Sequence, residues 1–208
     1  MDNNKHKRHL TKVDPVLGVL IKKIKLQEIK LRKNYFQALV VAIANQQLSG
    51  KAAQTILNRV LALFGSKKFP TPQEYLKMTN SKLRSAGFSN SKVAYTKNVA
   101  QFFINQKKEI KNIYKLSDEE IIKLLTTIKG VGIWTAEMFM IFSLGRENIF
   151  SYGDLGLRKG LQKVYGFKKE PTSKQMIKIV EAWKPYRTHG SRYMWASLDS
   201  QVENNKNK

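Results

Sequence analysis

Hydrophobic residues recur every three or four positions along most of the chain, a spacing that predicts helices. The stretch 35–45 (YFQALVVAIAN) is apolar on nearly all sides, which indicates a helix buried in a core. Another helix is expected to begin at Pro15, with Asp14 as its cap, because proline suits the first turn. Further helices are predicted at about 51–64, 81–87, 92–108, 133–144, 154–164, 172–183 and 188–200.

Polar residues between these segments provide helix start signals. Three capping boxes place a Ser or Thr before a helix and a Glu or Gln three residues later. They are Thr71 with Glu74, Ser117 with Glu120, and Thr172 with Gln175. No segment of note alternates between apolar and polar residues as a strand would, so the pattern predicts an all-α fold.

The charge balance adds a partner to this picture. The 208 residues include 38 Lys+Arg and 15 Asp+Glu, which gives a formal net charge of +23. Each cation that meets a nucleic-acid phosphate releases a condensed counterion, so such a charge favours a polyanionic partner. Nucleic acid is therefore the first expectation, and a general enrichment in lysine is the alternative.

The composition also excludes several kinds of site. Without Cys, the chain cannot form disulfides, Cys-ligated zinc sites or its own iron–sulfur cluster. Three scattered histidines (His6, His9 and His189) do not suggest a metal centre. Residues 1–12 are expected to form a basic mobile tail, and residues 202–208 a second tail.

No feature of a secreted or membrane protein is recognised. The N-terminal MDNNKHKRHL lacks an apolar core of signal-peptide length, and no apolar run approaches about 18 residues. The expectation is a soluble cytoplasmic protein with no membrane partner, associated with the nucleoid if its source is bacterial.

Two glycines interrupt the helical pattern at Lys129-Gly130-Val131-Gly132. Glycine permits a tight turn with positive φ and leaves backbone N–H groups uncovered at the start of the next helix. Such a turn can bind a phosphate and position a protein on nucleic acid without reading its sequence. An ordinary helix–turn–helix corner is the alternative, and the net charge of +23 favours phosphate binding.

Asp154 is the acidic residue with the clearest chemical potential. It precedes a predicted helix, where backbone N–H groups and the helix dipole favour a negative side chain. Gly153 and Gly156 are expected to keep its surroundings open. A fixed carboxylate can stabilise positive charge on a sugar whose glycosidic bond is breaking, or orient the attacking water. A plain helix cap is the alternative, and Asp199 is the second candidate carboxylate.

Four blocks of sequence together resemble the 3-methyladenine DNA glycosylase II family, in the compact branch of the helix-hairpin-helix DNA glycosylase superfamily. In the family's order, they are QQLSGKAA (46–53), IKGVGIWTAEM (128–138), DLGLRKG (154–160) and WKPYR (183–187). Each block is weak alone, and the joint match from about residue 14 to residue 195 is highly specific.

The resemblance implies a fold of two helical domains with the active-site cleft between them. One domain is expected to combine residues 13–35 with residues 144–201 and to carry the catalytic aspartate. The other is expected to cover residues 36–143 and to end in the helix-hairpin-helix.

The resemblance also implies roles for individual residues. Asp154 matches the catalytic aspartate, and Trp134, Trp195 and Met138 match positions that line the pocket for a flipped-out base. An aromatic face attracts a cationic methylated purine by roughly 0.5–2 kcal/mol. Core packing is the alternative for both tryptophans, and some relatives carry an aromatic residue at the position of Met138.

The same comparison assigns the contacts with DNA. Gln47, with Leu48 as its neighbour, matches the side chain that fills the gap left by the flipped nucleotide. The backbone of residues 129–132 is expected to bind a DNA phosphate. In such hairpins a monovalent cation, Na+ or K+, often bridges backbone carbonyls and the phosphate. The matching carbonyls are those of Thr126, Ile128 and Val131, and no other cofactor is expected.

Trp134 stands where bifunctional relatives place a Schiff-base lysine just after the hairpin, and Lys129 lies on the wrong side of the glycines. The resemblance therefore implies a monofunctional DNA glycosylase without lyase activity. It would hydrolyse the N-glycosidic bond of an alkylated purine, 3-methyladenine or 7-methylguanine, in double-stranded DNA during base excision repair. A monomer is expected.

Three alternatives are weighed against this hypothesis. A non-catalytic binder of damaged or structured DNA could use the same hairpin, but it has no reason to keep the carboxylate of Asp154 near phosphates. A glycosylase for oxidised or deaminated bases is disfavoured in its lyase branches by the missing lysine and Cys. A generic basic helical protein explains the charge but not the four ordered blocks.

Overall fold

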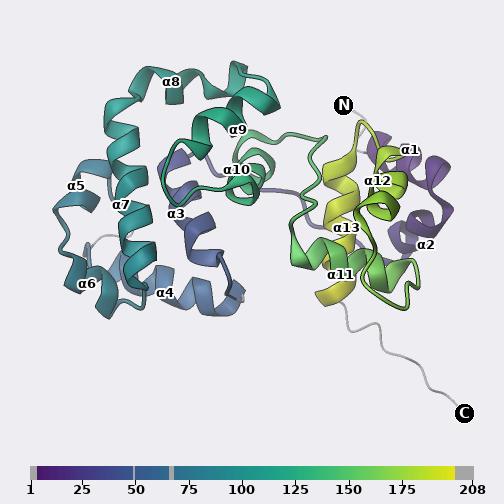
Figure 1. Ribbon diagram of the computed structural model, residues 1–208, viewed down its shortest axis with the longest axis horizontal. Helices are drawn as coiled ribbons and strands as arrows, with labels where there is room; N and C mark the ends of the chain where they lie inside the picture. Colours follow the sequence, from purple (N-terminus) through teal and green to yellow (C-terminus); the bar gives the residue numbers. More distant parts are fainter. Residues whose placement is uncertain (1–3, 49, 66–67, 200–208) are drawn as a thin grey trace, which may run out of the picture. The chain divides into compact units, whose positions relative to one another are not determined.

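The computed structural model describes residues 4–48, 50–65 and 68–199, and every regular element within them is helical (Figure 1). The predicted all-α fold class is confirmed. The chain divides into two compact units, which we call unit 1 (Met1–Ile29 with Arg146–Lys208) and unit 2 (Lys30–Gly145). The predicted divisions lie after residue 35 and after residue 143.

Unit 2 is built around the buried helix that the apolar stretch predicted. In chain order its elements are α3 (Tyr35–Asn45), α4 (Gly50–Ala62), α5 (Pro72–Lys77), α6 (Asn80–Ser85), α7 (Asn90–Asn105), α8 (Lys107–Asn112), η1 (Ile113–Lys115), α9 (Asp118–Thr126), α10 (Ile133–Phe139) and η2 (Met140–Leu144). Helix α3 packs against α4, α7 and α10. Its Phe36 ring meets the rings of Phe69, Tyr75 and Phe103 at centroid distances of 5.4–5.7 Å, so aromatic contacts form the centre of this unit.

Unit 1 joins the two ends of the chain. Its elements are α1 (Lys5–Val13), α2 (Pro15–Lys23), α11 (Leu155–Val164), α12 (Ser173–Glu181) and α13 (Arg187–Asp199). In Figure 1 the purple N-terminal helices lie beside the green and yellow C-terminal ones. Their shared core includes Leu17, Leu157, Leu161, Trp183 and Tyr193, all fully buried.

The predicted helix starts are confirmed where capping residues marked them. All three capping boxes form at Thr71, Ser117 and Thr172, with both reciprocal hydrogen bonds present. The segment predicted as one helix over 133–144 differs in its second half. It ends as α10 at Phe139 and continues as the π-helix η2, a change that apolar spacing does not signal.

The predicted mobile tail over residues 1–12 is wrong in its described part, because Lys5–Val13 form helix α1. Leu10 is fully buried in the unit 1 core, and the His6 ring stacks on His189 with centroids 3.9 Å apart. Burial, together with the nearby His189, lowers the pKa of His6 to about 4, so its ring is neutral near pH 7. The charge of this segment suggests a tail, but one face of the helix is apolar and aromatic and packs on unit 1.

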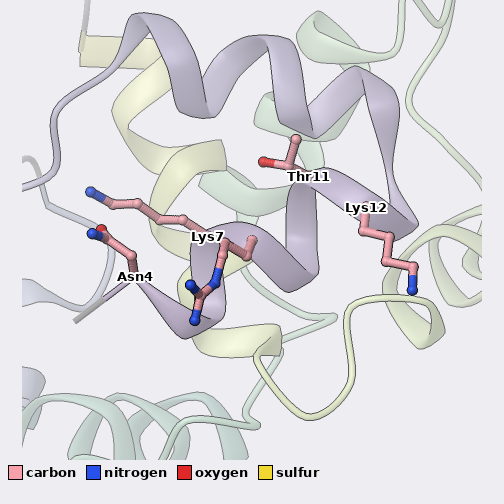
Figure 2. Close-up of a pocket in the computed structure, with 5 residues that line it drawn as sticks. Asn4, Lys7, Thr11 and Lys12 are labelled. Atoms are coloured by element: carbon pink, nitrogen blue, oxygen red, sulfur yellow. The ribbon is translucent and has the colours of Figure 1, made fainter. Parts of the chain in front are cut away.

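The basic residues of α1 lie on a different part of its surface. Asn4, Lys7, Arg8, Thr11 and Lys12 line a shallow groove there (Figure 2). Residues 202–208, the second predicted tail, lie outside the described residues. Among the helices that are described, none has the length and apolar character that crossing a membrane requires.

Asp14 connects the first helices of unit 1 to its last ones. Its Oδ1 accepts a hydrogen bond from the Leu17 N–H (2.9 Å), as expected for the cap of α2. Its Oδ2 accepts from Trp183 Nε1 (2.7 Å) and from the Tyr165 hydroxyl. The residue is 8% exposed, so these protein donors take the place of water.

Replacing Asp14 with alanine is therefore expected to destabilise the protein. An unsatisfied buried polar group costs about 1–3 kcal/mol, and Asp14→Ala leaves the Trp183 indole N–H and the Tyr165 hydroxyl without this acceptor, so we expect a loss of about 3 kcal/mol. Urea unfolding followed by circular dichroism measures the change. The control is Glu119→Ala, which removes an exposed carboxylate and should cost less than about 0.5 kcal/mol. Equal small effects would contradict the assigned role.

Candidate active site

The carboxylate of Asp154 is held by two donors at the start of α11. Its Oδ1 accepts hydrogen bonds from the Leu157 N–H (2.7 Å) and from Trp195 Nε1 (2.9 Å). Asp154 is the N-cap of α11 and is 8% exposed, so water has limited access to it. Both bonds point a hydrogen at the carboxylate, and the helix N-terminus adds a partial positive charge, so the arrangement stabilises a negative side chain.

Close packing of α11 on α13 creates this geometry. A Cβ at Gly156 would lie 3.0 Å from Asp154 Oδ1 and 3.0 Å from Trp195 Cδ1. One turn later, a Cβ at Gly160 would lie 2.7 Å from the backbone oxygen of Met194. The prediction that glycines on both sides keep Asp154 open is therefore wrong for Gly156, which allows the indole to approach. It fits Gly153, where a Cβ would meet nothing within 4 Å.

The glycine turn at residues 129–132 lies between α9 and α10 (Figure 1). Gly130 has φ +102°, a conformation that favours glycine, and a Cβ there would lie 2.1 Å from the Tyr95 ring. The Asn98 Nδ2 donates to the Lys129 carbonyl (3.1 Å). Lys129 and Gly132 are exposed, whereas the Val131 side chain is buried, so only backbone atoms of Val131 suit a phosphate contact.

The turn after α3 presents two exposed side chains. Gln47 has φ +58°, and it is the only non-glycine residue with a positive φ in the described part of the chain. Leu48 is 40% exposed. Ser49, which follows in the quoted sequence block, lies outside the described residues.

Trp134 and Met138 lie one helical turn apart on α10. Trp134 is half-buried, and Met138 is 8% exposed. Two members of the predicted base pocket therefore come from unit 2, while Trp195 and Asp154 come from unit 1. Asp199 ends α13, and its side chain lies outside what the structure describes.

Comparison with known proteins identifies the family. Residues 40–185 match the model of the HhH-GPD superfamily base excision DNA repair proteins. The chain belongs to this superfamily. DNA-3-methyladenine glycosylase 1 of Schizosaccharomyces pombe is 38% identical over 168 residues, which cover 79% of this chain and 72% of that protein. The alkylbase DNA glycosidase-like protein mag2 of the same yeast is 30% identical, with 93% of each chain covered.

A solved structure of this superfamily has the same fold. The 3-methyladenine DNA glycosylase Mag1 of Schizosaccharomyces pombe, in complex with abasic DNA, matches with a TM-score of 0.87 and 33% identity. The match covers 95% of this chain and 98% of that one. The resemblance stated from the sequence blocks is thereby confirmed, as is the helix-hairpin-helix glycosylase fold.

Metal ligands of the usual kinds are not clustered in the part of the chain that the structure describes. Among the described residues, no group of three or more His, Asp or Glu side chains could hold a metal ion. The predicted cation ligands are instead backbone carbonyls of Thr126, Ile128 and Val131. The Ile128 carbonyl already accepts the Val131 N–H (2.9 Å), and its second lone pair leaves room for a cation.

Sequence reasoning missed the residues that support these segments. Gln46 was part of a quoted block but received no role, and its side chain contacts the hairpin. Lys92 and Asn98 are single polar residues among many, and their contacts lie more than 30 positions away in the chain. Only Gly156 and Gly160 carried a usable signal, since glycines four residues apart on a helix indicate close helix packing.

Two glycine variants should test the role of the hairpin conformation. Gly130→Ala forces a Cβ into the Tyr95 ring in a left-handed conformation, so we expect the hairpin to shift and the affinity for duplex DNA to fall by about tenfold, as for loss of one strong phosphate contact. Gly50→Ala is the control, because its Cβ meets nothing within 4 Å, its φ is not positive and it lies on α4, outside the hairpin. Fluorescence anisotropy with a labelled duplex measures both. Equal losses would contradict this account.

Proposed function

We propose that the protein is a monofunctional DNA glycosylase that hydrolyses the N-glycosidic bond of alkylated purines in double-stranded DNA and leaves an abasic site. The names of its relatives support an alkylated base as the substrate. The single observation that carries the proposal is the carboxylate of Asp154, fixed by Leu157 and Trp195 at the start of α11. We further propose that 3-methyladenine and 7-methylguanine are substrates and that the enzyme acts as a monomer.

Asp154 supplies the charge that this reaction requires. When the bond between C1′ and the base nitrogen breaks, its electron pair leaves with the alkylated purine, which starts as a cation and departs neutral. Positive charge then develops on the sugar, and a preorganised carboxylate stabilises it. Water adds to C1′ and loses its proton, and a carboxylate near that water can orient it. The sugar keeps its phosphates, so no strand is cut.

Aromatic residues are proposed to recognise the base. Trp134 and Trp195 offer electron-rich faces, which attract a cationic methylated purine more strongly than a neutral, unmodified purine. Met138 adds a polarizable apolar surface. Because a base must leave the stack to reach such residues, the proposal includes base flipping.

The DNA backbone is proposed to bind at residues 129–132. Gly130 and Gly132 leave backbone N–H groups accessible there, and Lys129 adds an exposed positive charge. A Na+ or K+ ion bound by the carbonyls of Thr126, Ile128 and Val131 is proposed to join the hairpin to a phosphate. Gln47 or Leu48 is proposed to fill the gap left by the flipped nucleotide.

Release of methylated bases tests the proposed function. The wild-type protein should release 3-methyladenine and 7-methylguanine from methylated DNA, and Asp154→Asn should reduce the rate by about 100-fold or more. Asparagine keeps an oxygen at the Oδ1 position for Leu157 and Trp195, so folding and DNA binding should persist. Chromatography of released bases and an anisotropy assay with duplex DNA measure the two effects.

The outcome also decides between the alternatives. Asp199→Asn is the matched control and should leave base release unchanged. Release that survives Asp154→Asn but falls in Asp199→Asn would transfer the catalytic role to Asp199. If the wild-type protein and Asp154→Asn both bind damaged DNA tightly and neither releases a base, a non-catalytic binder would be favoured.

Trp195 is expected to act on the rate through its indole N–H. Trp195→Phe keeps an aromatic face but removes the donor to Asp154. A hydrogen bond to a charged group contributes about 1.5–3 kcal/mol, so kcat should fall roughly tenfold or more while KM changes little. Trp134→Phe makes the same indole-to-phenyl change elsewhere in the proposed pocket and should affect mainly KM. A Trp195→Phe variant with raised KM and unchanged kcat would contradict the assignment.

A further inference from the structure

Two segments proposed to contact DNA are joined by one side chain. The Gln46 Nε2 donates to the Gly130 carbonyl and to Thr135 Oγ1, each at 3.0 Å. A side-chain amide nitrogen has two hydrogens, so both are directed at the hairpin and at the helix that follows it. These partners are 84 and 89 positions away in the chain, so the contact exists only in the folded unit.

Lys92 holds the backbone of Gln46. The Lys92 Nζ donates to the carbonyls of Ala44 and Gln46, each at 2.8 Å. These carbonyls belong to the C-terminal end of α3 and the turn after it, where helix carbonyls lack internal partners and a positive charge is favourable. Burial lowers the pKa of Lys92, as expected for an ammonium group removed from water.

One face of α7 supports both segments. Lys92, Tyr95 and Asn98 follow each other at three-residue intervals, which places them on the same side of the helix. Lys92 holds the turn after α3, whereas Tyr95 packs against Gly130 and Asn98 donates to the Lys129 carbonyl. The turn and the hairpin are thus set on a common support.

The residues that follow Gln46 need such support. Gln47 adopts φ +58°, which is unfavourable for a residue with a Cβ, and Leu48 exposes 40% of its surface to water. The left-handed backbone of Gln47 costs free energy in the folded protein. This cost and the exposure of Leu48 are both understandable if these two side chains, which we call the turn tip, are positioned for a partner.

We propose that Gln46 and Lys92 are positioning residues that hold the turn tip (Gln47 and Leu48) in register with the phosphate-binding hairpin. The hairpin binds the DNA backbone, and the hydrogen bonds of Gln46 fix the position of the turn tip relative to the hairpin. The turn tip is then already in position to enter the gap left by the flipped nucleotide. This inference rests on the proposed function, since it concerns how the same protein opens its substrate.

Base release from two matched duplexes tests the inference. In one, the methylated purine is paired; in the other, it lies opposite an abasic-site analogue and is already unpaired. Gln46→Leu removes the two donors at nearly constant volume and should slow single-turnover release from the paired duplex by about tenfold or more. Release from the unpaired duplex should change less than about twofold, because the base opens without the turn tip.

Matched variants separate positioning from loss of folding or charge. Gln54→Leu removes an exposed amide on α4, and Lys82→Met removes an exposed charge on α6; both should behave as wild type. Lys92→Met should show the same substrate-dependent loss as Gln46→Leu. In a Gln47→Ala/Leu48→Ala background, Gln46→Leu should cause no further loss, because the side chains it positions are gone.

A binding measurement keeps the inference separate from the proposed catalysis. Wild-type protein should bind a duplex with an abasic site, which already contains the gap, more tightly than an intact duplex, and Gln46→Leu should lose this preference. That readout applies even if no base is released, an outcome that would refute the proposed function alone. Equal losses of base release by Gln46→Leu from the paired and the unpaired duplex would overturn the inference. A further loss when Gln46→Leu is added to the Gln47→Ala/Leu48→Ala variant would overturn it as well.

Discussion

The close packing of α11 against α13 is the constraint that places the carboxylate of Asp154. Gly160 lets α11 lie against the backbone of Met194, and Gly156 lets the Trp195 indole reach Asp154. The buried residues Leu157 and Leu161 hold the same helix in the unit 1 core. A charged group is thus oriented by apolar packing and two hydrogen bonds before any substrate arrives, which is how an electrostatic catalyst avoids reorganisation during the reaction.

Unit 2 holds the segments that are proposed to contact DNA in a different way. Its hairpin owes its conformation to Gly130, which packs on Tyr95, and its neighbouring turn is held by Gln46 and Lys92. Both segments depend on α7, and α7 packs on the buried α3. The aromatic core around Phe36 therefore supports polar contacts at the surface. In both units, exposed or charged groups with a proposed function are held in place by the packing of the residues beneath them.

Much of this fold could be predicted because its signals are local. Capping boxes at Thr71, Ser117 and Thr172 lie within four residues of the helices that they start, and apolar spacing marks the buried face of α3. Helix α1 was missed because its burial depends on Leu10 and His6 meeting residues near the other end of the chain. The π-helix η2 was missed because its apolar pattern is also that of an α-helix.

The candidate site shows the same division between local and distant information. Asp154 stood out because its position before a helix can be seen in seven residues. The donor role of Trp195 was not predicted, because an aromatic residue in a helix could equally line a pocket or pack in a core. Gln46 and Lys92 were beyond reach, since their partners are 46 to 89 positions away in the chain.

The central claim is that Asp154 stabilises positive charge on the sugar in the transition state. Its most direct test is the affinity for duplex DNA that contains an abasic nucleotide analogue with a protonated ring nitrogen, compared with the neutral analogue of the same shape. Transition-state analogues bind tightly, so wild-type protein should prefer the cationic analogue by about 100-fold. Asp154→Asn should abolish most of that preference. An equal preference in both proteins would contradict the claim.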